Sequence, residues 1–279
     1  MKSSAHDEPD ICLSGRIFEK SYAENLLSME DFFKCAYHNG FTSVELRDSQ
    51  IGIDASSEAI DEVNILSGRY GMPVSLITAR KGRLDNQEGY STFIRYLELA
   101  KNISCRRIKI SGTDLSLVTR AADKAGECDV QTGMNNHIGT PLETIDGTIE
   151  MFRKIDHPNF YLLFDPSHLW LNREGTILEF IDDVIGRIAY TIIQDYRESD
   201  NGKLYGTRRI VPVSTGETGS VGYREIIQRL LSRNFKGPFA LVYLGDGNRL
   251  RPGTGELKNH YMRYLTDSKE RKQENERRT

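Results

Sequence analysis

The sequence has little of several features that would place it in a specialised class of protein. It has four cysteines, Cys12, Cys35, Cys105 and Cys128, and no two of them form a C-x-x-C pair. No apolar run approaches the ~18 residues of a membrane-spanning helix. The formal net charge is only −3, which excludes the broad positive surface that DNA- and RNA-binding proteins present. The dispersed cysteines disfavour a zinc knuckle and favour free thiols in a reducing cytosol, so we expect a cytoplasmic protein.

The composition instead favours a folded domain of ordinary size. Hydrophobic residues make up 38% of the 279, with 13 Tyr and 11 Phe, which is enough to build a substantial core. The polar start, 1–10, is predicted to be a flexible leader without the apolar segment of a secretory signal. The end, 267–279, has no apolar residue and is predicted to be a charged tail. We therefore assign the folded domain to 11–266.

Short apolar segments alternate with helical patterns along this domain. The helices are predicted at 28–40, up to Gly71, at 87–101, 115–125, from 145, and at 176–185, 222–233 and 255–265. The strands are predicted at 11–18, 42–48, 73–79, 106–112, 129–137, 160–168, 187–195 and 238–246. Continuous apolar strands followed by amphipathic helices are typical of parallel strands covered by helices. Eight such units, with no G-x-G-x-x-G after the first strand, predict a single (β/α)₈ TIM barrel rather than an open sheet.

Polar residues follow most of the predicted strands. The carboxyl ends of the strands carry the active site in this fold, so these side chains are expected to converge on one pocket for a small polar molecule. The residues concerned are Glu45, Arg47, Arg80, Lys81, Arg83, Lys109, Asn135, Asn136, His137, Asp165, His168, Gln194, Asp195, Arg197, Tyr243 and Asp246.

Two histidines and one aspartate are the leading candidates for proton transfer. His168 follows a buried strand and a proline, and it could act as a general acid or base near neutral pH, or it could be a structural, hydrogen-bonded histidine. Asp165 could orient His168, hold a residual metal or simply hydrogen-bond inside the barrel. His137 could join the chemistry or only fix its loop.

The remaining candidates concern charge. Glu45 could be a base or bind a substrate hydroxyl, but a buried ion pair with Lys109 is an equal alternative. Lys109 could stabilise an enolate by its charge, form that pair, or form a Schiff base. Arg197 suits an anionic group such as phosphate or carboxylate, and we count it with Lys109 among the substrate-binding candidates.

Five motifs resemble those of the xylose isomerase-like TIM barrels, a superfamily of sugar isomerases and epimerases that also includes the family 2 AP endonucleases. They are VELRD (44–48), NNHIGTP (135–141), FDPSH (164–168), QDYR (194–197) and GETG (216–219), and the resemblance covers about residues 11–265. It implies a barrel enzyme in which a divalent metal, commonly Mn²⁺ or Mg²⁺, is held by two Glu, one Asp and one His.

The four metal positions of that family fall on Asn135, Asp165, Gln194 and Tyr243. Only one of these is a carboxylate, and hard cations bind more weakly as the charge of their oxygen ligands falls. We therefore expect no required cofactor, with weak Mn²⁺ or Mg²⁺ binding at Asp165 as an alternative. A metal displaced toward Asp195 or Asp246 is a further alternative.

The resemblance implies an isomerase or epimerase that moves a proton next to a carbonyl of a sugar, polyol or related compound. Without the family's two Glu, the proton relay would use His168, His137, Glu45 or Tyr243, while Asn135 and Gln194 would bind substrate. Two alternatives stay open: a catalytically degenerate barrel that binds a partner, and a lyase or dehydratase of a specialised pathway. The expected partners are a small polar substrate and other copies in a homo-oligomer, not nucleic acid or membrane.

Overall fold

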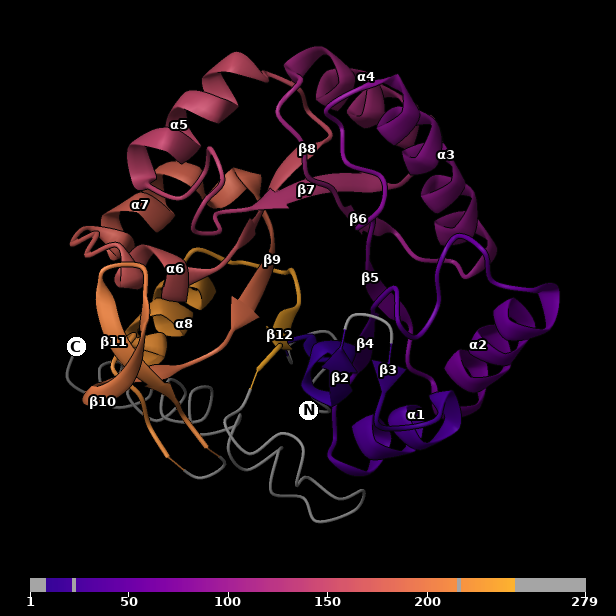
Figure 1. Ribbon diagram of the computed structural model, residues 1–279, viewed down its shortest axis with the longest axis horizontal. Coiled ribbons are helices and arrows are strands. Elements are labelled where there is room, and N and C mark those ends of the chain that lie inside the picture. Colours follow the sequence, from indigo (N-terminus) through magenta and orange to yellow (C-terminus); the bar gives the residue numbers. More distant parts are fainter. Residues whose placement is uncertain (1–8, 22–23, 215–216, 244–279) are drawn as a thin grey trace, which may run out of the picture.

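Eight parallel strands close into a barrel, as predicted. The computed structural model describes residues 9–21, 24–214 and 217–243. Each strand pairs in parallel with its neighbours, and β12 closes the barrel against β1 (Figure 1). The barrel strands are β1 (Ile11–Ser14), β4 (Ser43–Leu46), β5 (Val74–Thr78), β6 (Arg107–Lys109), β7 (Gln131–Asn135), β8 (Phe160–Phe164), β9 (Ile188–Ile193) and β12 (Phe239–Leu241).

Helices form a ring around this barrel. They are α1 (Met29–His38), α2 (Ser57–Tyr70), α3 (Gln87–Asn102), α4 (Leu115–Gly126), α5 (Ile145–Lys154), α6 (Pro166–Leu171), α7 (Ile177–Val184) and α8 (Tyr223–Ser232). Local chemistry sets many of their ends. Ser28 accepts a hydrogen bond from the backbone of Asp31 at the start of α1, and Asp114 does the same for Ser116 and Leu117 at α4. Gly71 ends α2 in the left-handed conformation that glycine adopts without strain.

The core has two layers, because successive strand residues point to opposite faces of the sheet. The outer layer lies between strands and helices and includes Val44 and Leu46 of β4. The inner layer fills the barrel with Cys12, Leu76, Leu163, Tyr190, Ile192 and Ala240. Glu45 lies between Val44 and Leu46 and therefore faces the inner layer, where its carboxylate accepts a hydrogen bond from Tyr190.

The structure departs from the sequence prediction at three strand ends. The first strand ends at Ser14, and Gly15–Phe18 forms a 3-10 helix. The sixth barrel strand ends at Phe164, so the rest of FDPSH opens helix α6, with Pro166 at its first turn and Asp165 as its cap. Proline favours that position because it needs no amide donor there.

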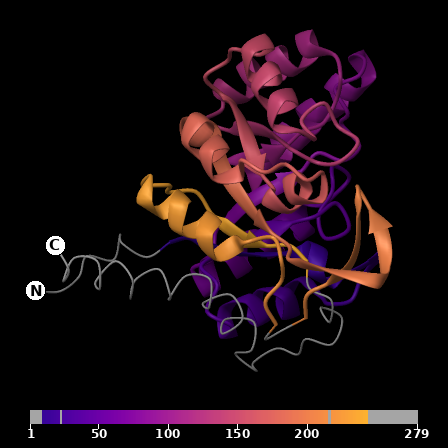
Figure 2. The same ribbon diagram turned by 90° about the vertical axis from the view of Figure 1, so that its left-hand side faces the viewer.

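The third departure is a hairpin after the seventh barrel strand, which the sequence analysis did not predict. Strands β10 (Tyr196–Tyr205) and β11 (Arg208–Pro212) pair antiparallel, and a shorter pair, β2 (Glu19–Ser21) and β3 (Glu24–Asn25), follows the first strand. Figure 2 shows the β10–β11 hairpin standing out from one end of the barrel.

Some expectations fall outside the described residues. They concern residues 1–8 of the leader, the helix at 255–265, the tail at 267–279, Asp246 and the first residue of GETG. Within the described ranges, none of the helices has the length and apolar character needed to cross a membrane.

Candidate active site

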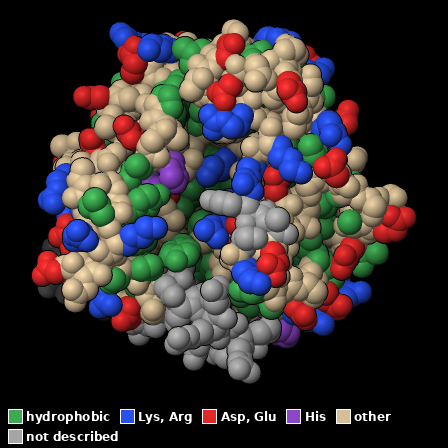
Figure 3. Space-filling model, viewed as in Figure 1, with side chains coloured by type: hydrophobic (Ala, Val, Ile, Leu, Met, Phe, Trp, Pro, Cys, Tyr) green, Lys and Arg blue, Asp and Glu red, His purple; other side chains and the backbone are tan. Residues whose placement is uncertain are grey.

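A cavity of about 500 Å³ opens at the carboxyl ends of the barrel strands. Figure 3 shows a hollow at the centre of this face, with Lys and Arg side chains around it and a histidine at its edge. The polar residues that line the cavity are Arg16, Arg47, Lys109, Asn135, His137, Asp165, His168, Gln194, Tyr196, Lys203, Tyr205 and Tyr243.

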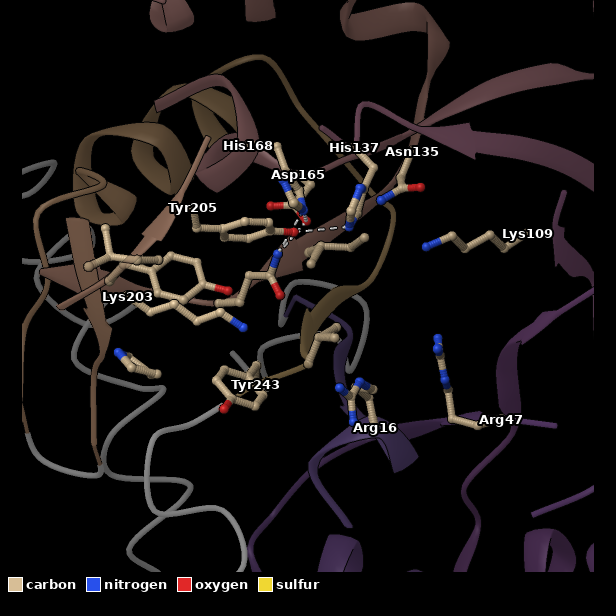
Figure 4. A pocket seen from close by; sticks show the side chains of 16 residues that line it. Arg16, Arg47, Lys109, Asn135, His137, Asp165, His168, Lys203, Tyr205 and Tyr243 are labelled. Atoms are coloured by element: carbon tan, nitrogen blue, oxygen red, sulfur yellow. Dashed lines mark hydrogen bonds and ion pairs between the residues drawn. The ribbon is translucent and has the colours of Figure 1, made fainter. Parts of the chain in front are cut away.

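Two groups of these residues lie on opposite sides of the cavity (Figure 4). We call His137, Asp165, His168, Gln194 and Tyr205 the histidine wall; its members follow β7, β8 and β9 or belong to the hairpin. We call Arg16, Arg47 and Lys109 the cationic wall; its members come from β1, β4 and β6 or the turns after them.

Asp165 is the centre of the histidine wall. Its Oδ1 accepts hydrogen bonds from the Ser167 hydroxyl (2.6 Å) and backbone amide (3.2 Å), and its Oδ2 accepts one from Gln194 Nε2 (2.7 Å). The side chain of Asn136 bridges to the Asp165 backbone with two bonds of 2.7 Å, which joins the ends of β7 and β8. Burial raises the pKa of Asp165 to about 6, against the opposing effect of the Ser167 hydrogen bonds.

The two histidine rings stack beside this aspartate with centroids 3.9 Å apart. His168 is 1% exposed, and its Nε2 lies 3.4 Å from Asp165 Oδ2. Burial, followed by the charge of Lys109, lowers the pKa of His168 to about 3, so its ring is neutral near pH 7. Burial and the neighbouring His168 also lower the pKa of His137.

The hydrogen bonds of His137 define its tautomer. Its Nδ1 lies 2.7 Å from the carbonyl oxygen of Ile138, so this nitrogen carries the proton and donates. In the neutral ring the lone pair is then on Nε2, which lies 3.2 Å from the hydroxyl of Tyr205. His137 is half-buried and reaches the cavity, whereas His168 lies beneath it.

The β10–β11 hairpin places Tyr205 on this histidine. The turn after Tyr205 has Gly206 at φ +58, where a Cβ would lie 2.8 Å from Ile138 and 3.0 Å from the Leu171 carbonyl. Arg208 donates to the carbonyl of Trp170 (2.7 Å) and stacks over its ring. These contacts tie the hairpin to the end of α6, so Tyr205 reaches the cavity from a segment far from β7 in the sequence.

Buried carboxylates hold the arginines of the cationic wall. Arg47 Nη1 donates to Glu45 (3.0 Å) and Thr78 (3.2 Å), and its Nε lies 3.7 Å from Glu19. Arg16 lies 3.5 Å from the same Glu19. The Glu19 and Glu45 side chains are only 2–3% exposed, so they lie behind the wall rather than on the cavity surface.

Lys109 differs from the two arginines. Its amino group faces the cavity and makes no hydrogen bond or ion pair with any residue in the described part of the chain. Burial, and next the charge of Arg47, lowers its pKa to about 8, while Glu45 and Asp165 act in the opposite direction. At neutral pH the amino group therefore still carries its positive charge.

The structure brings most of the predicted site residues together. The cavity gathers Asn135, His137, Asp165, His168, Gln194, Tyr243 and Lys109, as the strand-end positions predict. Their roles stay predictions.

Two predicted site residues lie elsewhere. Glu45 is behind the cationic wall, and its buried pair forms with Arg47 instead of the expected Lys109. Arg197 is 45% exposed, binds Glu217 (3.2 Å) and does not line the cavity, because β10 carries it outward. Asp195, considered as an alternative metal ligand, accepts hydrogen bonds from the backbone amides of Tyr196, Gly219 and Val221.

Sequence reasoning missed four lining residues. Arg16 follows the first barrel strand and could have been found by extending the search of strand ends to that strand. Tyr196, Lys203 and Tyr205 belong to the hairpin, whose pairing was not recognised. Arg47 was noted at its strand end but was not assigned to the site.

The side chains at the family's metal positions do not fit a divalent metal. Asn135, Asp165, Gln194 and Tyr243 all line the cavity, but they supply one carboxylate, and both of its oxygens already accept hydrogen bonds. Gln194 points its amide nitrogen at Asp165. Among the described residues, no three or more His, Cys, Asp or Glu gather in a way that could hold a metal ion.

Comparisons with known proteins agree with this architecture. The family model of the xylose isomerase-like TIM barrel matches residues 33–261. None of the curated proteins matches the sequence.

Solved structures share the fold at low sequence identity. The probable 3-DHS dehydratase AsbF of Bacillus anthracis superposes with a TM-score of 0.71 at 17% identity, over 92% of this chain and 98% of that chain. A xylose isomerase-like TIM barrel protein of Mycobacterium smegmatis, in complex with magnesium, gives 0.71 at 17% identity, over 95% and 99%. A family 2 AP endonuclease of Brucella melitensis gives 0.66 at 16% identity, over 89% and 96%.

Proposed function

The chain belongs to the xylose isomerase-like TIM barrel family, and on this premise we propose that it is an enzyme that moves a proton on the carbon next to a carbonyl group. The substrate is a sugar, polyol or related hydroxy-carbonyl compound, and the leading reaction is isomerisation or epimerisation. The observation that carries the proposal is the lone pair of His137 Nε2, held at the cavity surface beside the Tyr205 hydroxyl.

His137 suits the role of base better than His168. A base works best when it is neutral and accessible at the working pH and has a pKa not far below it. The pKa of His168 is near 3, and its ring lies below the cavity surface, so this histidine accepts a proton poorly at pH 7. We assign it instead to positioning His137, against which it stacks.

The other cavity groups complete the reaction. His137 takes the proton from carbon, and the Tyr205 hydroxyl, hydrogen-bonded to the same nitrogen, relays a proton to the product. Lys109 lies across the cavity with its positive charge, which stabilises the enolate oxygen as negative charge develops there. No step requires a bound divalent metal, so activity is expected to persist in EDTA, and complete loss in EDTA would contradict this part of the proposal.

A dehydratase is the second candidate. It starts with the same proton abstraction, after which a hydroxyl group two carbons from the carbonyl carbon leaves as water. The structural similarity to a probable 3-DHS dehydratase over nearly the whole chain favours keeping it. The fold alone does not separate the two outcomes, because the chemistry depends on the site.

The test is exchange of substrate protons with heavy water. A panel of hydroxy-ketones and hydroxy-keto acids is incubated with the enzyme in deuterated buffer and followed by NMR, while mass spectrometry detects loss of water. His137→Gln is expected to slow exchange by about 10²-fold or more, and His38→Gln, on the exposed end of α1, is the matched control. Absence of exchange with every compound would favour a catalytically degenerate barrel, and equal rates for His137→Gln and wild type would reject His137 as the base.

A further inference from the structure

We propose that the cationic wall binds an anionic group of the substrate, a carboxylate or a phosphate, so that the substrate is a small acid rather than a neutral sugar. The inference rests on the proposed function for the word substrate, but the binding site itself is argued from charge and geometry. It is carried by the placement of Arg16, Arg47 and Lys109 on one side of a cavity whose opposite side holds the proton-transfer groups (Figure 4).

The formal charges of the cavity lining are the first argument. Among the described lining residues, Asp165 is the single carboxylate, and it faces four cationic side chains, those of Arg16, Arg47, Lys109 and Lys203. The two Asp165 oxygens already accept three hydrogen bonds within the histidine wall. A neutral polyol would leave the positive charge of this lining uncompensated, whereas an anion compensates it directly.

Lys109 is the second argument. A half-buried ammonium group without an acceptor loses hydration and gains nothing in return, which is unfavourable unless a ligand supplies the acceptor. Its charge is also repelled by Arg47, and the two effects together depress its pKa. An anion placed between these two cations relieves the repulsion and provides the missing hydrogen-bond acceptor.

The fixed position of Arg47 is the third argument. Its side chain is 13% exposed, and Glu45, Glu19 and Thr78 hold its Nη1 and Nε from behind. A guanidinium that is already immobile loses little side-chain entropy when it binds a ligand. Arginine also matches the geometry of carboxylate and phosphate oxygens, so the wall is suited in shape as well as in charge.

The experiment compares ligands that differ in charge but little in shape. Xylonate, xylitol and inorganic phosphate are titrated separately into the whole protein by calorimetry at pH 7. At least one of the two anions is expected to bind about tenfold or more tightly than xylitol, which corresponds to about 1.4 kcal/mol. Preference for xylonate over phosphate would identify the group as a carboxylate, and the reverse preference would identify it as a phosphate.

Variants then locate the site. Lys109→Met keeps a flexible apolar stem, removes the charge, and is expected to weaken anion binding about tenfold without changing xylitol binding. Lys81→Met is the matched control, because Lys81 follows the neighbouring strand β5, pairs with Asp54 at the surface and does not line the cavity. Lys109→Arg keeps the charge and is expected to retain the anion preference.

The pH dependence gives a readout that a purely structural lysine would not produce. The charged groups facing Lys109 are Arg47 and Glu45 of β4 and Asp165 after β8. Xylonate affinity of the wild type is expected to fall as the pH rises from 7 to 9, since Lys109 then loses its proton, while Lys109→Arg is expected to show a smaller change.

Three outcomes would overturn the proposal: equal affinity for xylonate, phosphate and xylitol, binding of neither anion, or unchanged anion affinity in Lys109→Met. Because binding is measured without turnover, the proposed reaction can fail in the exchange experiment while the anion site stands, and the reverse can also occur.

Discussion

The two walls of the cavity differ in how far the protein satisfies its own polar groups. In the histidine wall, Asp165, Gln194, His168, His137 and Tyr205 are joined by hydrogen bonds or ring contacts. In the cationic wall, buried glutamates hold the arginines from behind, but the amino group of Lys109 has no partner among the described residues. A satisfied wall keeps a fixed shape for chemistry, whereas an unsatisfied charge favours binding of a ligand.

Burial also acts on the two walls in opposite ways. It keeps both histidines neutral by lowering their pKa, so the histidine wall can accept a proton. It lowers the pKa of Lys109 only to about 8, so the cationic wall keeps its charge at pH 7. The same desolvation therefore produces a neutral base on one side and a charged binding group on the other.

The largest expected effect comes from removing the support of the cationic wall. Glu45→Ala leaves Arg47 buried without its closest carboxylate and is expected to lower the free energy of unfolding by about 3–5 kcal/mol. Urea denaturation measures this change. Glu217→Ala removes the partner of the exposed Arg197 and is the control, with an expected change below about 1 kcal/mol. Similar losses in the two variants would contradict the contrast between buried and exposed pairs.

The next effect separates Asp165 from His168 by pH. Because the pKa of His168 is lowered to about 3 in the folded state, its contribution to stability is present above the unfolded value of 6.5 and is lost as the pH falls. Because the pKa of Asp165 is raised to about 6, from 3.8, its cost to stability is relieved over pH 6 to 4. In the wild type these two slopes oppose each other.

His168→Gln removes one of the two slopes. Relative to wild type, its free energy of unfolding is expected to rise by about 1 kcal/mol per pH unit as the pH falls from 6 to 4. Denaturation at several pH values measures the difference, with His38→Gln as the control. Parallel stability curves for His168→Gln and wild type would show that His168 is not held neutral by the fold.

A smaller effect tests the cost of the unpaired lysine. Lys109→Met is expected to raise the free energy of unfolding at pH 7 by about 1–3 kcal/mol, because a charged group with a depressed pKa destabilises the folded state. The gain is expected to shrink as the pH rises from 8 toward 10.5, where the wild-type lysine loses its charge in both states. A loss of stability at pH 7 would show that the amino group is satisfied in the protein.

The smallest effect is expected at Arg197, outside both walls. Its exposed pair with Glu217 contributes about 0–1 kcal/mol, so Arg197→Ala is expected to change stability by no more than that. Its xylonate affinity should equal that of wild type in the same titration. A tenfold loss of affinity would return Arg197 to the substrate-binding groups.

The sequence predicted the barrel well because the signals are local. Apolar strands followed by amphipathic helices recur eight times, and polar residues at the strand ends correctly indicated the cavity that gathers Asp165, His168 and Gln194. It failed where the outcome depends on distant segments. The hairpin pairs residues within 196–212 and docks on α6, and nothing in its local pattern predicted that Tyr205 would reach His137.

The sequence by itself determined the closed barrel, the end of the barrel that holds the site, and the loss of all but one carboxylate from the family's metal positions. Only the tertiary structure decided which partner each charge has: Glu45 binds Arg47 behind the wall, Arg197 points outward, and Lys109 is left without a partner among the described residues. The reason is physical. Periodicity and chain order set which elements form, but ion pairing and burial depend on contacts between strands that are far apart in the chain.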